Sequence, residues 1–210
     1  MFSGCLFAVV LLAGTPAADP SSVVRGLQGW LDGTSTLDMR FRQSLVSGAL
    51  GTTATESGRM YLERPGKLRW DYLEPEKKIA LLLGDRTELY LEDDRLLTRG
   101  RLPAEQGLFP RLLAGRERLE HLFTATLAAA PAGGGGSVRL RLAPKGEPGG
   151  MAVVVVTLRT SSFAIESAEL VDETGNRTTY VFSDIRRNRG VPAGVFGFEP
   201  PPGTEIVDEP

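Results

Sequence analysis

The 210-residue sequence contains only one cysteine, Cys5, and one histidine, His121. A zinc site of the usual ligand types cannot be assembled from so few of these residues, and a Ser-His-Asp triad would depend on His121 alone. The sequence has no Gly-x-Ser-x-Gly motif, and the glycines at 133–136 lack the Lys-Ser/Thr pair of a phosphate-binding loop. We therefore expect no catalytic residues, no metal site and no cofactor.

An excess of charge of either sign is also missing. The chain has 24 Lys and Arg against 26 Asp and Glu, and its basic residues are interspersed with acidic ones instead of forming a stripe. Nucleic acid is therefore not an expected partner. A hydrophobic content of 41% over this length is typical of a globular protein. We expect one domain, residues 19–210, large enough to fold without disulfides.

Residues 1–18 (MFSGCLFAVVLLAGTPAA) contain an apolar run at 6–13, followed by helix-breaking and small residues. This order is typical of a secretory signal peptide, which we expect to be cleaved near Ala17 or Ala18. A buried first helix is the alternative, but the run lacks an amphipathic period and is too short to span a bilayer. Cys5 precedes the apolar run, whereas a lipid-modified cysteine would follow it.

The hydrophobic periodicity changes at Gly33. Before it, a helix start at Asp19 is followed by apolar residues at helical spacing, which predicts one amphipathic helix. After it, apolar and polar residues alternate, which predicts a half-buried strand. The helical set is Val23, Val24, Leu27, Trp30 and Leu31, and the alternating set is Leu37, Met39, Phe41 and Leu45.

Strand-like runs then recur about every ten residues, separated by turn sequences such as Pro65-Gly66. The stretch 104–122 breaks this pattern and predicts one or two short helices. The glycine-rich 131–137 is interpreted as a hairpin loop, with a domain linker as the alternative. Further strand-like runs extend to a closing FGFEPPPGTEIV at 196–207. Roughly ten or eleven strands in one curved antiparallel sheet are expected, with a dry concave face that helices or a ligand must fill.

Several motifs occur in a familiar order. They are MRFRQ at 39–43, GRMYLERPGKLRWDYLEPE at 58–76, a Gly84-Asp85 turn leading to LYL, GNRTTYVFSDI at 175–185 and FGFEPPPGTEI at 196–206. In this order they resemble the LolA family of periplasmic outer-membrane lipoprotein carriers, over nearly all of residues 20–208.

The resemblance implies an unclosed β-barrel whose apolar concave face is covered by a helical lid. It also implies a monomeric periplasmic carrier, without enzymatic activity, that takes acylated lipoproteins from an inner-membrane exporter to an outer-membrane acceptor. Folds of this kind also bind other amphiphiles, such as glycolipids or pigment precursors, or act as sensors of lipoproteins, and fold alone does not decide between these functions. A secreted lipid hydrolase is disfavoured by the single histidine.

The resemblance also assigns roles to residues. Arg64 would latch the empty lid through backbone carbonyls of the lid helices, and an exposed arginine at a strand end is the alternative. Met and bulky side chains on the concave face suit ligands of varied shape, although they could instead form a permanent core. The glycine-rich loop at 133–136 and Pro110 in the lid depart from the family pattern. The expected cavity residues are Met39, Phe41, Leu45, Met60, Leu62, Leu68, Trp70 and Tyr72, and the expected lid residues are Leu108, Phe109, Leu112 and Leu113.

Overall fold

The computed structural model describes residues 19–102, 107–115, 117–129, 135–146 and 150–209. The expected signal peptide at 1–18 and most of the glycine-rich loop lie outside these residues. The helices are α1 (Pro20–Asp32), α2 (Leu108–Leu113) and α3 (Leu119–Leu122). The strands are β1 (Thr36–Val46), β2 (Thr53–Glu63), β3 (Lys67–Glu74), β4 (Lys78–Leu83), β5 (Arg86–Leu91), β6 (Leu96–Arg101), β7 (Phe123–Ala128), β8 (Ser137–Pro144), β9 (Met151–Arg159), β10 (Ile165–Asp172), β11 (Arg177–Arg187) and β12 (Glu205–Asp208).

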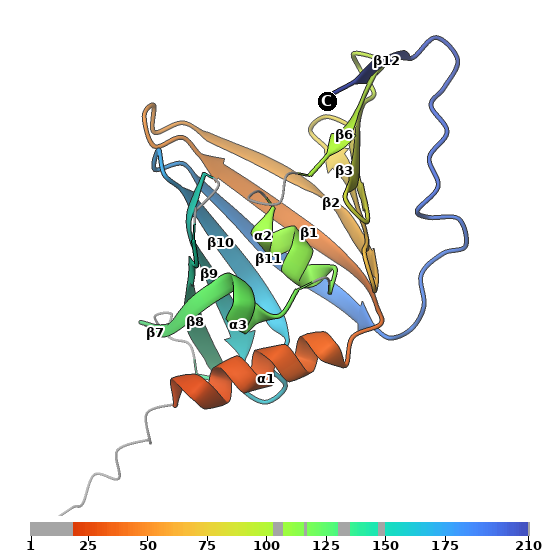
Figure 1. Ribbon diagram of the computed structural model, residues 1–210. Helices are drawn as coiled ribbons and strands as arrows, with labels where there is room; N and C mark the ends of the chain where they lie inside the picture. The colour runs from red at the N-terminus through yellow and green to blue at the C-terminus, as the bar shows by residue number, and fades with distance from the viewer. Residues whose placement is uncertain (1–18, 103–106, 116, 130–134, 147–149, 210) are drawn as a thin grey trace, which may run out of the picture.

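All described strands belong to one 12-stranded sheet in the order β12-β6-β5-β4-β3-β2-β1-β11-β10-β9-β8-β7. Neighbouring strands are antiparallel except β12, which pairs parallel to β6. The sheet curls without closing, because among the described residues β7 and β12 each pair along one side only. Figure 1 shows this half-barrel, with α2 and α3 inside the curve and α1 across one end. The expected mainly β, unclosed barrel is therefore confirmed.

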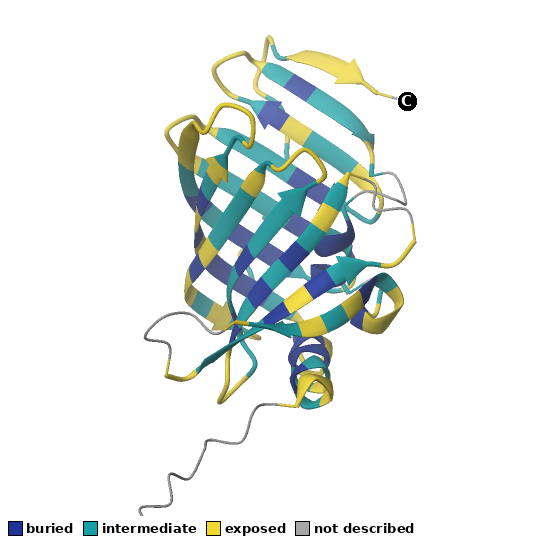
Figure 2. Ribbon diagram, turned by 90° about the vertical axis from the view of Figure 1, so that its left-hand side faces the viewer, coloured by how far each residue is buried: buried dark blue, intermediate teal, exposed yellow. Residues whose placement is uncertain are grey.

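The core lies on the concave face of the sheet. Successive side chains of a strand point to opposite faces, so buried residues alternate with less buried ones over much of the half-barrel (Figure 2). The register places Met60, Trp70 and Ala80 side by side on neighbouring strands. On the other half of the sheet, Leu140 and Val156 are a similar facing pair. The buried residues at these positions are in phase with the alternation read from the sequence, whereas Leu45 is 44% exposed.

Helix α1 begins where its sequence supplies a cap. The carboxylate of Asp19 accepts hydrogen bonds from the backbone N–H groups of Ser21 and Ser22, both at 3.2 Å. Pro20 occupies the first turn, where no N–H is needed. The helix ends at Gly33, and its apolar stripe packs against β7 and β8. The stripe consists of Val23, Leu27, Trp30 and Leu31.

Helix α2 tolerates its proline because the proline lies in the first turn. Pro110 is the third residue of the helix, and the first four N–H groups of a helix have no intrahelical acceptor. The departure noted in the sequence therefore leaves the helix intact. No helix in the described part of the chain combines the length and apolar character that crossing a bilayer would require.

The segment between β11 and β12 covers the convex face of β3 to β5 (Figure 1). Arg69 Nη1 donates to the carbonyl of Val195 at 2.7 Å, and the rings of Tyr90 and Phe198 have centroids 4.9 Å apart. The sequence predicted a strand through 196–207, but only Glu205–Asp208 forms one. The physical reason is the run of three prolines, which lack the N–H groups that a strand donates.

Candidate functional site: an apolar cavity beneath a helical lid

The concave face gathers most of the apolar residues expected from the sequence. Trp70 and Tyr72 are half-buried beside the fully buried set, whereas Leu45 lies at the far end of β1 and is 44% exposed. The structure therefore brings together all but Leu45. The residues that are less than 5% exposed are Met39, Phe41, Met60, Leu62 and Leu68.

Helix α2 rests on this face with its apolar side inward. Leu108, Phe109, Leu112 and Leu113 are each at most 7% exposed, and all four belong to the same core as the strand residues. Between the helix and the sheet remains a cavity of about 240 Å³. It is lined by Trp70, Tyr72, Ala80, Phe109, Pro110, Leu113, Leu170, Tyr180 and Phe182.

A second cavity, of about 420 Å³, lies on the other side of Pro110. It shares Trp70, Ala80 and Pro110 with the first, so these residues mark the boundary between the two cavities. The second cavity is more polar than the first. Its polar lining residues are Thr87, Glu88, Thr98 and Glu209. Its remaining lining residues are Leu81, Leu82, Leu89 and Leu102.

Polar side chains surround Tyr72, one of the residues that line the smaller cavity. The Tyr72 hydroxyl donates to Gln43 Oε1 at 2.9 Å, and the Lys78 ammonium lies 4.3 Å from the centroid of the Tyr72 ring. Lys78 also pairs with Glu56. Burial raises the pKa of Tyr72 and also that of Tyr180, so both hydroxyls remain protonated. The sequence did not single out these polar residues.

Arg64 connects the sheet with two of the helical segments. Its backbone N–H donates to the carbonyl of Ser35 at 2.8 Å, and its Nη1 donates to the carbonyl of Leu31 in the last turn of α1. The guanidinium group also lies against Gly115, just after α2, and would overlap any side chain placed there. Burial lowers the pKa of Arg64 while Asp32 opposes that shift. The carbonyl acceptor belongs to α1, whereas the contact with the described part of the α2 segment is at Gly115.

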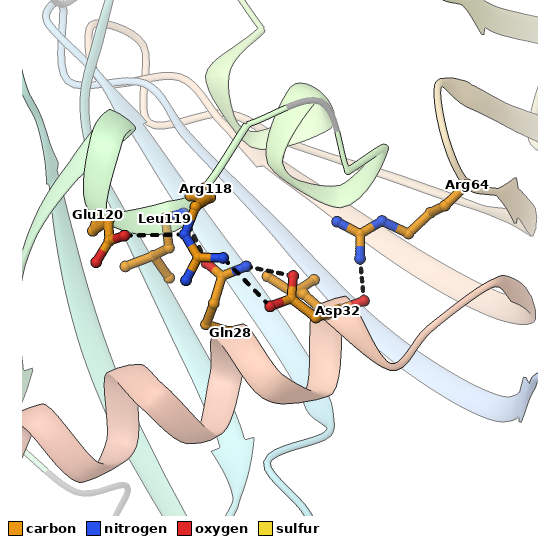
Figure 3. Close-up of polar contacts among 7 residues, drawn as sticks. Gln28, Asp32, Arg64, Arg118, Leu119 and Glu120 are labelled. Atoms are coloured by element: carbon orange, nitrogen blue, oxygen red, sulfur yellow. Dashed lines mark hydrogen bonds and ion pairs between the residues drawn. The ribbon is translucent and has the colours of Figure 1, made fainter.

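A second set of contacts joins α1 to α3 (Figure 3). Gln28 is only 8% exposed, its Oε1 accepts from the backbone N–H of Leu119 at 2.9 Å, and its Nε2 donates to Asp32 at 2.7 Å. Arg118, the N-cap of α3, forms ion pairs with Asp32 at 3.7 Å and with Glu120 at 3.0 Å. Sequence reasoning missed Gln28, although a glutamine between Leu27 and Leu31 on an apolar helix face was a usable signal.

A second arginine also holds the end of α1. Arg187 of β11 donates through Nη2 to the carbonyl of Trp30 at 3.1 Å and through Nε to the Thr34 hydroxyl at 2.7 Å. Its guanidinium carbon lies 5.6 Å from the centroid of the Trp30 ring. Arg64 and Arg187 thus both satisfy carbonyls at the end of α1, where the helix dipole favours positive charge.

The family described as "Outer membrane lipoprotein carrier protein LolA" matches residues 32–199 of this chain. An outer-membrane lipoprotein carrier protein from Chromobacterium violaceum is 31% identical over 206 residues, which cover 96% of this chain and 95% of that protein. A protein of the same name from Dechloromonas aromatica is 32% identical over 208 residues, covering 98% and 94%.

Solved structures support the fold. An uncharacterized conserved protein from Thermus thermophilus has a TM-score of 0.57 at 11% identity, over 90% of this chain and 98% of that one. A protein of the DUF1329 family from Desulfovibrio piger has a TM-score of 0.50 at 14% identity, over 85% and 98%. At such low identity these likenesses concern the fold only.

Proposed function

This chain belongs to the LolA family of outer membrane lipoprotein carrier proteins, and on that basis we propose that it shields the acyl chains of lipoproteins in transit through the periplasm. The observation that carries the proposal is the apolar cavity between α2 and the concave face of the sheet. The apolar side chains that line such a cavity can surround an acyl chain in place of the lipids of a membrane. Donor and acceptor would be an inner-membrane exporter and an outer-membrane receptor.

The small size of this cavity indicates that α2 lies in a closed position. Ligand pockets usually measure about 300–1,000 Å³, and the cavity beneath α2 measures about 240 Å³. An acyl chain can enter only if α2 moves away from Trp70 and Tyr72. Each buried lid side chain contributes about 1.5–3 kcal/mol to closure, and apolar contacts with the cargo replace that contribution on loading. The free energies of the closed and the loaded protein are therefore expected to be similar, which suits reversible transport.

We infer that Arg64 favours closure through the segment after α2. A charged hydrogen bond to Leu31 of α1, of a kind that contributes about 1.5–3 kcal/mol, holds its guanidinium group against Gly115. When α2 leaves the cavity, the contact between Arg64 and Gly115 must change with it. Loading would disturb the latch and unloading would restore it, so the loaded state stays only modestly favourable.

Depletion of the protein tests this function directly. In cells without the chain, lipoproteins destined for the outer membrane should accumulate in the inner-membrane fraction, and expression of the chain should restore their distribution. Purified protein should carry acylated lipoprotein detectable by mass spectrometry. An unchanged lipoprotein distribution, with only free glycolipid or another amphiphile bound, would contradict the proposal and favour a different cargo.

A further inference from the structure

The side chain of Trp70 contains an unused hydrogen-bond donor. Its Nε1 is buried, and no described residue accepts a hydrogen bond from it. Other buried polar groups on the concave face and in α1 have partners, such as Tyr72 with Gln43 and Gln28 with Asp32. Buried donors are rarely left unpaired in native proteins, so an exception indicates a missing partner.

The position of Trp70 restricts the chemistry of that partner. The indole lies at the boundary between the two cavities, with the apolar one beneath α2 on one side and the more polar one on the other. A ligand that spans this boundary would place an apolar chain beneath α2 and a polar group beside Thr87 and Thr98. The acceptor would then lie where the chain meets its head group.

The charges around the two cavities further restrict which chemical group can accept a hydrogen bond from Trp70. None of the described lining residues of either cavity is a lysine or arginine, and the carboxylate of Glu88 is already paired with Arg99 at 3.4 Å and with Arg86 at 3.7 Å. With no cation among the lining residues to pair with it, a carboxylate or phosphate at the boundary is disfavoured, and a neutral carbonyl is favoured. Ester and amide carbonyls are neutral acceptors of this kind, and they join acyl chains to the rest of an acylated molecule.

We propose that the indole N–H of Trp70 donates a hydrogen bond to the ester or amide carbonyl at the head end of a bound acyl chain. The inference rests on the proposed carrier function and specifies how the bound acyl chain is oriented. The hydrocarbon tail points beneath α2 toward Tyr180 and Phe182. The polar part of the cargo leaves past Thr87 and Thr98, toward β5 and β6.

The test uses two uncharged probes that differ in the carbonyl: monopalmitoylglycerol, with an ester-linked chain, and its ether analogue hexadecylglycerol. The chain has two tryptophans, so proton–nitrogen correlation spectra of the labelled protein should show two indole signals. The variant Trp30→Phe identifies the signal of Trp70 by elimination. We expect the ester to move the Trp70 indole proton downfield and the ether to leave it nearly unchanged, with no such difference at Trp30.

Binding affinities give a second measurement. The wild-type protein should prefer the ester by about fivefold, the ratio expected for one neutral hydrogen bond, and Trp70→Phe should reduce that preference to near unity. The two ligands are compared on the same protein. Packing lost at position 70 therefore weakens both ligands alike and does not change the ratio of their affinities. Binding of both probes with equal affinity and no shift of the Trp70 signal would overturn the assignment and leave the carrier function standing. Failure of both probes to bind the wild-type protein would overturn the acyl-binding function itself.

Discussion

The guanidinium group of Arg64 lies directly against Gly115, so that one side chain from the end of β2 is in contact with the segment after α2 while it donates to the end of α1. The backbone reinforces this junction, since the N–H of Gly66 donates to the carbonyl of Ala114 at 2.8 Å. Movement of α2 away from the sheet therefore cannot leave Arg64 undisturbed. This coupling is the basis of the first two predictions.

Replacement Arg64→Leu should allow loading and impair unloading. The variant loses the guanidinium group that the bond to Leu31 holds against Gly115, so the closed position of α2 loses a contact and loaded protein becomes relatively more stable. Arg64→Lys should restore transfer only in part, because an ammonium group lacks the planar fork of donors. The measurement is transfer of a defined lipoprotein from loaded carrier to acceptor membranes.

Arg187→Leu is the matched control for Arg64. It removes a second arginine that donates to α1, but the described contacts of Arg187 are with α1 and the residues that follow it, not with α2. We expect reduced thermal stability with transfer close to wild type. Equal transfer by the wild-type and Arg64→Leu proteins would show that Arg64 is a structural residue at a strand end.

Replacement Gly115→Ala should reproduce the transfer defect without touching Arg64 itself. The new methyl group would displace the guanidinium, and alanine at φ of +73° costs about 1–2 kcal/mol. Gly175→Ala separates the two effects, since Gly175 has φ of +86° with no atom within 4 Å of an added Cβ. Both variants should lose stability, and only Gly115→Ala should lose transfer. A normal rate of transfer by Gly115→Ala would argue against the latch.

Replacement Phe109→Glu should open the lid. Phe109 is 3% exposed and faces Trp70 across the cavity, so a carboxylate there would be buried without a partner and α2 would leave the sheet. We expect a lower melting temperature and stronger fluorescence from an apolar dye at equilibrium. Phe109→Leu, which keeps the apolar contact, should change both far less. Unchanged melting and dye binding in Phe109→Glu would remove Phe109 from the lid.

Replacement Gln28→Leu should detach α3 from α1. The backbone N–H of Leu119 would lose its acceptor in a buried position, at a cost of about 1–3 kcal/mol in the free energy of unfolding. Denaturant unfolding measures this loss, and hydrogen exchange at Leu119 should accelerate. Asp32→Asn keeps the Gln28 bond to Leu119 and serves as the control for the neighbouring polar contacts. Unaltered exchange at Leu119 in Gln28→Leu would contradict the assigned role.

The exported protein should begin near Asp19. A cleavage at Ala17 or Ala18 leaves the N-cap of α1 intact, because the capping carboxylate belongs to Asp19 itself. N-terminal sequencing of protein recovered from the periplasm measures the site. A mature protein that starts at a lipid-modified Cys5 would contradict the expectation and indicate a membrane-anchored form.

Local patterns in the sequence were sufficient to predict which side chains form one wall of the cavity. Leu68, Trp70 and Tyr72 could be placed on one face because side chains alternate along any strand. The opposite wall, which includes Tyr180 and Phe182, depends on pairing between β1 and β11, strands separated by most of the chain. No local pattern specifies such a register, so these residues were not identified.

The polar contacts were harder to predict for a different reason. The partner of Arg64 is the carbonyl of Leu31, and a backbone carbonyl has the same chemistry at every position of the sequence. Only the path of the folded chain decides which carbonyl it reaches. The same holds for the unused donor of Trp70, which is visible only once every neighbouring acceptor has been located.

The short parallel pairing of β12 with β6 has a consequence for self-association. Without β12, the outer side of β6 would present a row of unpaired N–H and C=O groups, which is the usual template for joining sheets of different molecules. The last strand occupies those groups with four residues from the same chain. If the cavity opens for cargo as proposed, apolar surface is exposed at the same time. Pairing of β12 with β6 then removes a second route by which neighbouring copies would aggregate, at that edge of the sheet.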